Sequence, residues 1–181
     1  RRLDSGDRNV VTIEDPIEYS IPSVDQIEVK TRFGQTFEAA LRSVLRQDAD
    51  VVLIGEIRDE ETAKIACQAA TTGQLVLSTL HATDPVSAIY RMLDLNVAPY
   101  NLASAIRGVV SQQLFRKLCQ ECRIEYTADD TELKRLALPD GHGPIYTSPD
   151  SSTNTCLNCN GKGFVGRTGV FGLLEVTPAI R

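Results

Sequence analysis

The chain has 181 residues, of which 42% are hydrophobic and 24% charged, and its formal net charge at pH 7 is -5. These values are typical of a globular protein with one domain and a small module, and they argue against a nucleic-acid-binding class, which needs a basic face. No apolar run approaches the roughly 18–20 residues that span a bilayer, and the charged first residues have no apolar segment behind them, so we expect neither a membrane-inserted helix nor a secretory signal.

The first two thirds of the chain alternate between strand and helix patterns. Apolar runs predict strands over 9–13, 50–54 and 75–80, and a strand-like run within a polar stretch predicts another around 26–30. Amphipathic patterns predict helices that begin after the capping residues Thr36, Asp59 and Asp84. A further long helix is predicted over 100–118. This alternation predicts an α/β domain that ends near Leu118, with a parallel sheet and helices on both of its faces.

The composition changes after Leu118. A short helix is predicted over 129–138. The stretch 139–154 is rich in Gly, Pro, Ser and Thr and predicts a loop. Short strands separated by glycines are expected to follow and to end near Val176.

Acidic residues and a histidine follow three of the predicted strands. They are Glu14, Asp15 and Glu18 after the first strand, Glu56 after the third, and His81 after the fourth. The carboxyl ends of parallel strands meet at one edge of a sheet, where ligands of open α/β folds bind. An acid there can orient water or hold Mg²⁺ in a phosphate-hydrolysing site, and Gly55 would let the backbone approach a ligand closely.

Each of these residues also has an ordinary structural interpretation. The acids after the first strand are compatible with a solvated loop, and Glu56 with a buried strand followed by a helix-capping acid. His81 is compatible with a structural hydrogen bond. Their shared place at one predicted sheet edge is what favours a functional site.

Four of the five cysteines form two pairs, Cys119-x-x-Cys122 and Cys156-x-x-Cys159. Each pair can present two thiolates to one tetrahedral ion, and Zn²⁺ prefers such closed four-sulfur sites when its role is structural. The alternatives are core cysteines without a metal, or a redox pair. Cys67 lies in a predicted helix rich in alanine and is expected to be a small buried hydrophobe.

Three segments together resemble the motor ATPases of bacterial type II secretion and type IV pilus assembly. Thr12-Ile13-Glu14-Asp15-Pro16-Ile17-Glu18 looks like the aspartate box of this family, residues 45–59 look like its Walker B segment, and residues 72–81 look like its histidine box. Order and spacing agree, and the likeness extends to both cysteine pairs and to Gly166-Arg167-Thr168-Gly169.

The resemblance implies a RecA-like motor that acts as a homo-hexameric ring on the cytoplasmic side of the inner membrane, where it contacts the platform proteins of the pilus or secretion system. It implies ATP and Mg²⁺ as cofactors, Glu56 as the hydrolytic acid and Glu14 as the alternative. Asp15 and Glu18 would support water or Mg²⁺, and His81 would sense the γ-phosphate. Arg58 would signal across a subunit interface, and Arg167 would approach the nucleotide.

The resemblance also implies that residues 1–118 are an ATPase core without its P-loop part, and that 119–181 are the tetracysteine zinc module and the start of a C-terminal subdomain. No G-x-x-x-x-G-K-[ST] segment occurs in these residues, so the P-loop is expected upstream and the chain alone is expected not to hydrolyse ATP. Gln74 and Gln113 also depart from the family pattern. The tetracysteine module favours assembly or secretion over pilus retraction.

Three functions therefore compete. The first is part of a motor ATPase, and the second is a zinc-stabilised protein-interaction module without catalysis. The third is a zinc-ribbon nucleic-acid binder, which the acidic charge and the few aromatic residues disfavour. A P-loop upstream in the parent gene would separate the first two.

Overall fold

A computed structural model describes residues 8–138 and 142–181, so the charged first residues lie outside the described part. The chain divides into two compact units, Arg1–Ser111 with Gly172–Arg181, and Gln112–Phe171. All four paired cysteines lie in the second unit. No helix in the described residues has the length and apolar character needed to cross a membrane.

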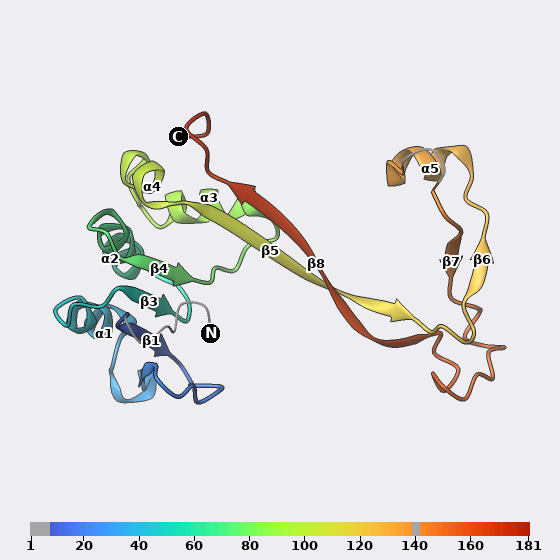
Figure 1. The fold of residues 1–181 in the computed structure, drawn as a ribbon, viewed down its shortest axis with the longest axis horizontal. Coiled ribbons are helices and arrows are strands. Elements are labelled where there is room, and N and C mark those ends of the chain that lie inside the picture. Colours follow the sequence, from blue (N-terminus) through green and yellow to red (C-terminus); the bar gives the residue numbers. More distant parts are fainter. Residues whose placement is uncertain (1–7, 139–141) are drawn as a thin grey trace. The chain divides into compact units, whose positions relative to one another are not determined.

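A four-stranded parallel sheet forms the centre of the first unit (Figure 1). Its strands are β1 (Val10–Glu14), β2 (Asp25–Glu28), β3 (Val51–Ile54) and β4 (Leu75–Ser78), in the spatial order β2-β1-β3-β4. Ile13 pairs with Ile54, and Ile54 pairs with Ser78, so these three strands end in register. The predicted parallel sheet is confirmed, and the carboxyl ends of its strands share one edge.

Helices separate three of these strands and follow the last one. Between β2 and β3 lie η1 (Thr31–Phe33) and α1 (Phe37–Val44), between β3 and β4 lies α2 (Glu60–Thr71), and after β4 come α3 (Pro85–Asp94) and α4 (Pro99–Ala105). The three predicted N-caps are confirmed, because the side chains of Thr36, Asp59 and Asp84 each accept a hydrogen bond from a backbone N–H in the first turn.

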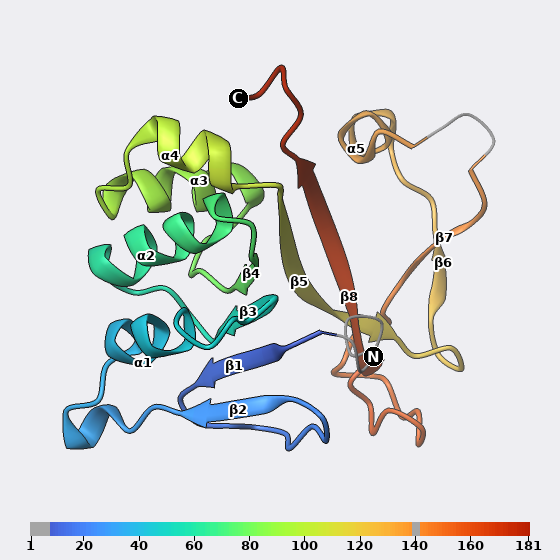
Figure 2. The same ribbon diagram turned by 60° about the vertical axis from the view of Figure 1, so that its left-hand side comes forward.

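The core of the first unit lies between one face of the sheet and the layer of α1, α2 and α4, which Figure 2 shows side by side. The buried sheet side chains on this face are Val11, Ile13, Val52 and Ile54. On the opposite face, Leu75 and Leu77 of β4 are 41% and 39% exposed. The predicted helices on both faces are therefore not seen in the described part of the chain, whose helices cover one face.

The prediction of one helix over 100–118 is wrong. The helix ends at Ala105, Ile106 is extended, and β5 (Gly108–Leu118) follows. Apolar residues three and four apart, such as Leu102, Ile106 and Val110, imitate a helical period. Pairing of β5 with a strand far along the chain overrides that local pattern.

That partner is β8 (Phe164–Glu175), a single long strand where the sequence predicted several short ones. In the second unit, β6 (Ile124–Tyr126) pairs antiparallel with β7 (Ile145–Thr147). β7 lies within the predicted loop 139–154, of which residues 142–154 are described. The predicted helix is α5 (Asp130–Leu136), which begins with a capping box formed by Asp129 and Glu132.

Candidate functional site

The ends of three parallel strands are joined by hydrogen bonds at one edge of the sheet. The backbone N–H of Gly55 donates to the carbonyl oxygen of Ile13 at 2.8 Å. The hydroxyl of Thr79 donates to the carbonyl oxygen of Gly55 at 2.6 Å, and that of Ser78 donates to the carbonyl oxygen of Ile54 at 2.8 Å. These bonds fix the segments that carry the acids and the histidine relative to one another.

Gly55 has a steric role in this arrangement. A Cβ atom at this position would lie 3.2 Å from the carbonyl oxygen of Ile13 and 3.5 Å from the Cα atom of Glu14. The sequence suggested that Gly55 permits close approach of a ligand. The structure shows that the nearest atoms are the backbone of β1, so glycine here allows the ends of β1 and β3 to approach each other.

The carboxylate of Glu56 contacts two side chains, Arg58 and His81. Its Oε1 atom forms an ion pair with Nη2 of Arg58, and its Oε2 atom lies 3.5 Å from Nε2 of His81. The Glu56 side chain is 16% exposed, whereas that of His81 is 93% exposed. The hydrogen bond to Glu56 raises the pKa of Arg58, and the charges of Glu56 and Asp15 add to that effect. The predicted residues Asp15, Glu56, Arg58 and His81 thus come together at this edge.

Glu14 is held by two donors that the sequence analysis missed. Thr12 donates through its hydroxyl to Oε1 of Glu14 at 2.6 Å, and Gln26 donates through Nε2 to the same oxygen at 2.9 Å. Thr12 could have been found from the sequence, because residues two apart on a strand share a face. Gln26 could not, because its place opposite Thr12 depends on the register between β1 and β2.

The side chain of Gln26 also forms hydrogen bonds with the loop after β1. Its Nε2 atom donates to the carbonyl oxygen of Tyr19 at 3.0 Å, and its Oε1 atom accepts from the N–H of Ile21 at 2.7 Å. One amide therefore connects the Glu14 carboxylate to the loop that contains Glu18. Glu18 itself is exposed, and within the described residues no bond joins it to Glu14 or Glu56. Arg167 is exposed on β8 in the second unit.

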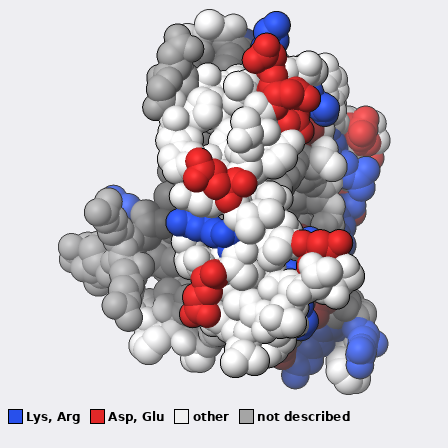
Figure 3. Space-filling view, turned by 90° about the vertical axis from the view of Figure 1, so that its right-hand side faces the viewer, with Lys and Arg blue, Asp and Glu red and all other residues white. Residues whose placement is uncertain are grey.

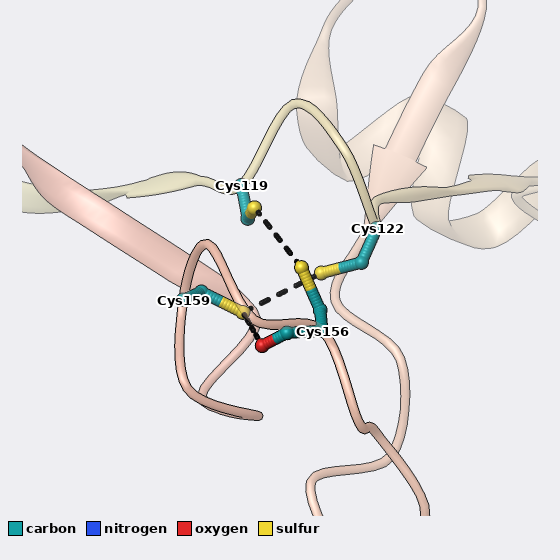
Figure 4. A group of neighbouring side chains, drawn as sticks. All are labelled: Cys119, Cys122, Cys156 and Cys159. Carbon is teal, nitrogen blue, oxygen red and sulfur yellow. Dashed lines mark hydrogen bonds between the residues drawn. The ribbon is translucent and has the colours of Figure 1, made fainter.

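The four paired cysteines form a compact cluster (Figure 4). All four Sγ atoms lie within 4.8 Å of one another, with Cys119 3.9 Å from Cys156 and Cys122 3.6 Å from Cys159. A zinc tetrahedron with Zn–S bonds of about 2.3 Å has sulfur–sulfur edges of about 3.8 Å. The donor set and its spacing therefore fit one tetrahedral zinc ion.

Burial raises the pKa of both Cys122 and Cys159, whereas the hydrogen bond between them raises the pKa of Cys122 and lowers that of Cys159. Burial raises the pKa of Cys122, and the contact with Cys159 adds to this, so that it reaches about 12. Burial also acts to raise the pKa of Cys159, but hydrogen bonds from the N–H of Gly163 and from Cys122 lower it to about 7. If all four were thiolates, they would repel one another at this distance, and a bound cation would offset that repulsion.

Cys67 lies apart from this cluster. It is buried in α2, and burial raises the pKa of its thiol. The expectation of a small buried hydrophobe is confirmed.

Charged side chains are mixed on the face shown in Figure 3. Among the described residues that this view shows, Lys and Arg lie singly or in small groups near Asp and Glu.

The whole chain, residues 1–181, matches the family described as "Type II/IV secretion system protein". The chain belongs to this family. The resemblance drawn from the aspartate, Walker B and histidine boxes is thus confirmed at the level of the family.

Named relatives in this family are secretion and pilus-assembly ATPases. The chain is 44% identical over 181 residues to "Type IV pilus assembly ATPase PilB" of Thermus thermophilus. This alignment covers 100% of this chain and 20% of that relative. It is 43% identical over 181 residues to "Type II secretion system ATPase E" of Vibrio cholerae, covering 100% of this chain and 35% of that relative. The chain therefore spans between a fifth and about a third of these relatives.

Solved structures support the same fold. "Crystal Structure of the Pilus Retraction Motor PilT and Bound ADP" is 37% identical, with a TM-score of 0.57, and covers 62% of this chain and 36% of that chain. The ATPase DotB of Legionella pneumophila has a TM-score of 0.61 over 98% of this chain and 39% of its own. At 19% identity, DotB shows the fold alone.

Proposed function

We propose that this chain is part of a motor ATPase that couples ATP hydrolysis to the assembly of a type II secretion pseudopilus or a type IV pilus. The observation that carries the proposal is the contact of Glu56 with both Arg58 and His81 at the carboxyl edge of the sheet. Glu14 lies at the end of the adjacent strand β1. The names of the relatives, which are secretion and pilus-assembly ATPases, support the same reaction.

In this proposal Glu56 orients the attacking water, with Glu14 as the alternative. Glu14 accepts both of its bonds on Oε1, an arrangement that suits Oε2 for water or Mg²⁺. Asp15 and Glu18 add negative charge for Mg²⁺, which prefers carboxylate oxygens and, when bound, neutralises charge on the transferred phosphoryl group.

His81, Arg58 and Arg167 have their own proposed roles. His81, which is 93% exposed, is free to contact the γ-phosphate of ATP. Arg58 would respond to the neighbouring subunit, and Arg167 would approach the nucleotide.

The rest of the motor is proposed to lie elsewhere in a longer protein. Backbone N–H groups and a lysine of a P-loop would hold the phosphates. The longer protein would act as a homo-hexamer on the cytoplasmic side of the inner membrane, against the platform proteins of its system. Residues 1–118 would belong to the RecA-like core, and residues 119–181 would form the tetracysteine module and the start of a C-terminal subdomain.

The cysteine cluster is proposed to hold one structural zinc ion. Cys119, Cys122, Cys156 and Cys159 would fill all four positions of the tetrahedron and leave none for water. The cluster joins the turn after β5 to the loop before β8, so the metal would close that end of the β5–β8 pair.

The test of the ATPase proposal replaces Glu56 with Gln in the full-length protein. The variant keeps the size of the side chain and removes its charge, so turnover should be lost while nucleotide binding is retained. Glu125→Gln, an exposed glutamate on β6, is the matched control. Near-normal turnover of Glu56→Gln with loss in Glu14→Gln would move the role to Glu14. Normal turnover in both would show that neither acid is needed for hydrolysis, whereas a full-length protein without any turnover would favour a zinc-stabilised interaction module.

A further inference from the structure

Amide groups from one loop point at most of the sulfur atoms of the cysteine cluster. Within the described residues, three of the four Sγ atoms accept a hydrogen bond from an N–H of residues 154–163. The bonds run from Nδ2 of Asn158 to Cys119 at 3.4 Å, from Nδ2 of Asn154 to Cys122 at 3.6 Å and Cys159 at 3.8 Å, and from the backbone N–H of Gly163 to Cys159 at 3.2 Å.

The two asparagines stand on either side of Cys156 in the sequence and reach sulfurs of both cysteine pairs. Asn154 contacts Cys122 of the first pair and Cys159 of the second, and Asn158 contacts Cys119 of the first pair. Each sulfur of the first cysteine pair thus accepts a hydrogen bond from an asparagine in the loop that carries the second pair. Both asparagines face the sulfurs with the amide nitrogen, which donates hydrogen bonds and has no free lone pair for a metal.

We propose that Asn158 and Asn154 are positioning residues of the metal centre, which bind its thiolates through their side-chain amides and set how tightly the ion is held. The inference rests on the zinc site proposed above. Four thiolates around Zn²⁺ leave a net charge of about -2. N–H donors that face the sulfurs stabilise this charge and hold the ligands in place, as the residues around a metal centre commonly do.

The two asparagines differ in the other hydrogen bonds that their side chains form. Asn154 also accepts from the N–H of Cys156 and donates to the carbonyl oxygen of Gly161, both at 3.1 Å. It therefore shapes the loop as well as facing the sulfurs, and a change at Asn154 would combine two effects. Asn158 is described with a single side-chain bond, which goes to Cys119. Asn158 is therefore the residue to test.

The experiment uses Asn158→Asp in the full-length protein. The replacement is isosteric, but an oxygen takes the place of the N–H₂ donor and a negative charge then faces Cys119. Zinc affinity, measured by competition with the chromophoric chelator 4-(2-pyridylazo)resorcinol, should fall by about 10- to 100-fold. The transfer of zinc to the chelator should accelerate. Asn158→Ala removes the donor without adding charge and should show a smaller loss.

The matched control is Asn160→Asp. Asn160 lies in the same loop, is exposed, and has a φ of 48°, a conformation that Asp also tolerates. The Asn160→Asp replacement adds the same charge as Asn158→Asp but removes no described hydrogen bond to a sulfur atom. Its zinc affinity should stay within about threefold of the wild type, because an exposed charge acts weakly across water.

A spectroscopic measurement separates a positioning role from a general loss of stability. With Co²⁺ in place of zinc, loss of the N–H donor leaves the Cys119 thiolate richer in electrons. The thiolate-to-cobalt charge-transfer band of Asn158→Asp and Asn158→Ala should therefore shift to lower energy, and that of Asn160→Asp should not.

The outcomes are distinct. Wild-type zinc affinity together with an unshifted band in Asn158→Asp would overturn the role of Asn158. A wild-type protein that binds neither zinc nor cobalt at its cysteines would instead overturn the proposed metal site itself.

Discussion

His81 lies 3.5 Å from Glu56, measured from Nε2 to Oε2, although the two residues follow different strands. The imidazole is 93% exposed, whereas the carboxylate is 16% exposed. The acid is therefore fixed in the protein, and the histidine stands where a ligand can reach it.

We expect His81→Ala to lower kcat for ATP in the full-length protein by about 100-fold, the usual effect of removing one group that stabilises developing charge. The measurement is steady-state phosphate release at saturating ATP. His142→Ala is the control, because the chain has two histidines and His142 lies on an exposed segment of the second unit. Equal activity of both variants would remove His81 from the site.

Gly55→Ala should lower ATP turnover in the full-length protein by displacing the end of β1 at the same edge of the sheet. The added Cβ would sit 3.2 Å from the carbonyl oxygen of Ile13, which already accepts the N–H of Gly55. The end of β1 would have to move by a few tenths of an ångström, and Glu14 with it. We expect kcat to fall by about 10-fold, since small misplacements of reacting groups are costly.

The control for Gly55→Ala is Gly143→Ala, where an added Cβ would meet nothing within 4 Å. Steady-state turnover and a thermal melt of both variants are the measurements. A Gly55→Ala protein with wild-type kcat would show that the close approach of β1 and β3 has no bearing on the reaction.

Gln26→Glu should lower turnover through Glu14. The amide that donates to Oε1 of Glu14 at 2.9 Å would become a carboxylate, and the two like charges would repel each other. We expect kcat to fall by about 10-fold with nucleotide binding little changed. Gln68→Glu, the same replacement on the exposed side of α2, should leave kcat at the wild-type value. If the two variants behave alike, the Gln26–Glu14 bond has no part in positioning the acid.

Removal of zinc should destabilise the second unit and leave the stability of the first unit unchanged. Helix α5 has no buried residue, and β6 is exposed along its length, so burial alone supports this unit poorly. Hydrogen–deuterium exchange after chelation should show lost protection within Gln112–Phe171 and retained protection in β1, β3 and β4. Protection should return with Zn²⁺ and not with Mg²⁺. Unchanged exchange in the zinc-free second unit would contradict a structural role for the metal.

Much of the first unit could be predicted from local patterns. Strands β1, β3 and β4 are short apolar runs, and Thr36, Asp59 and Asp84 each cap the helix that the sequence predicts after them. Such features depend on residues a few positions apart, so the sequence carries them directly. β5 was misread because its apolar spacing also suits a helix, and its true partner β8 is distant in the chain.

Some residues of the candidate site could likewise be predicted from local patterns, and others could not. The acids at the strand ends, His81 and the two C-x-x-C pairs are recognisable as residue types at particular spacings. The donors to Glu14 and to the sulfurs are not, because Gln26, Asn154 and Asn158 acquire their roles through register and loop folding.

By itself, the sequence determined the family, the parallel α/β architecture and the four candidate metal ligands, since each rests on the order and spacing of nearby residues. The tertiary structure alone decided that Glu56 faces both Arg58 and His81, that one face of the sheet carries the helices, and that asparagine amides face the thiolates. The contacts of Glu56 with His81 and of the asparagines with the first cysteine pair join side chains that are far apart in the sequence. Their distances follow from strand pairing, packing and loop closure, which no local pattern encodes.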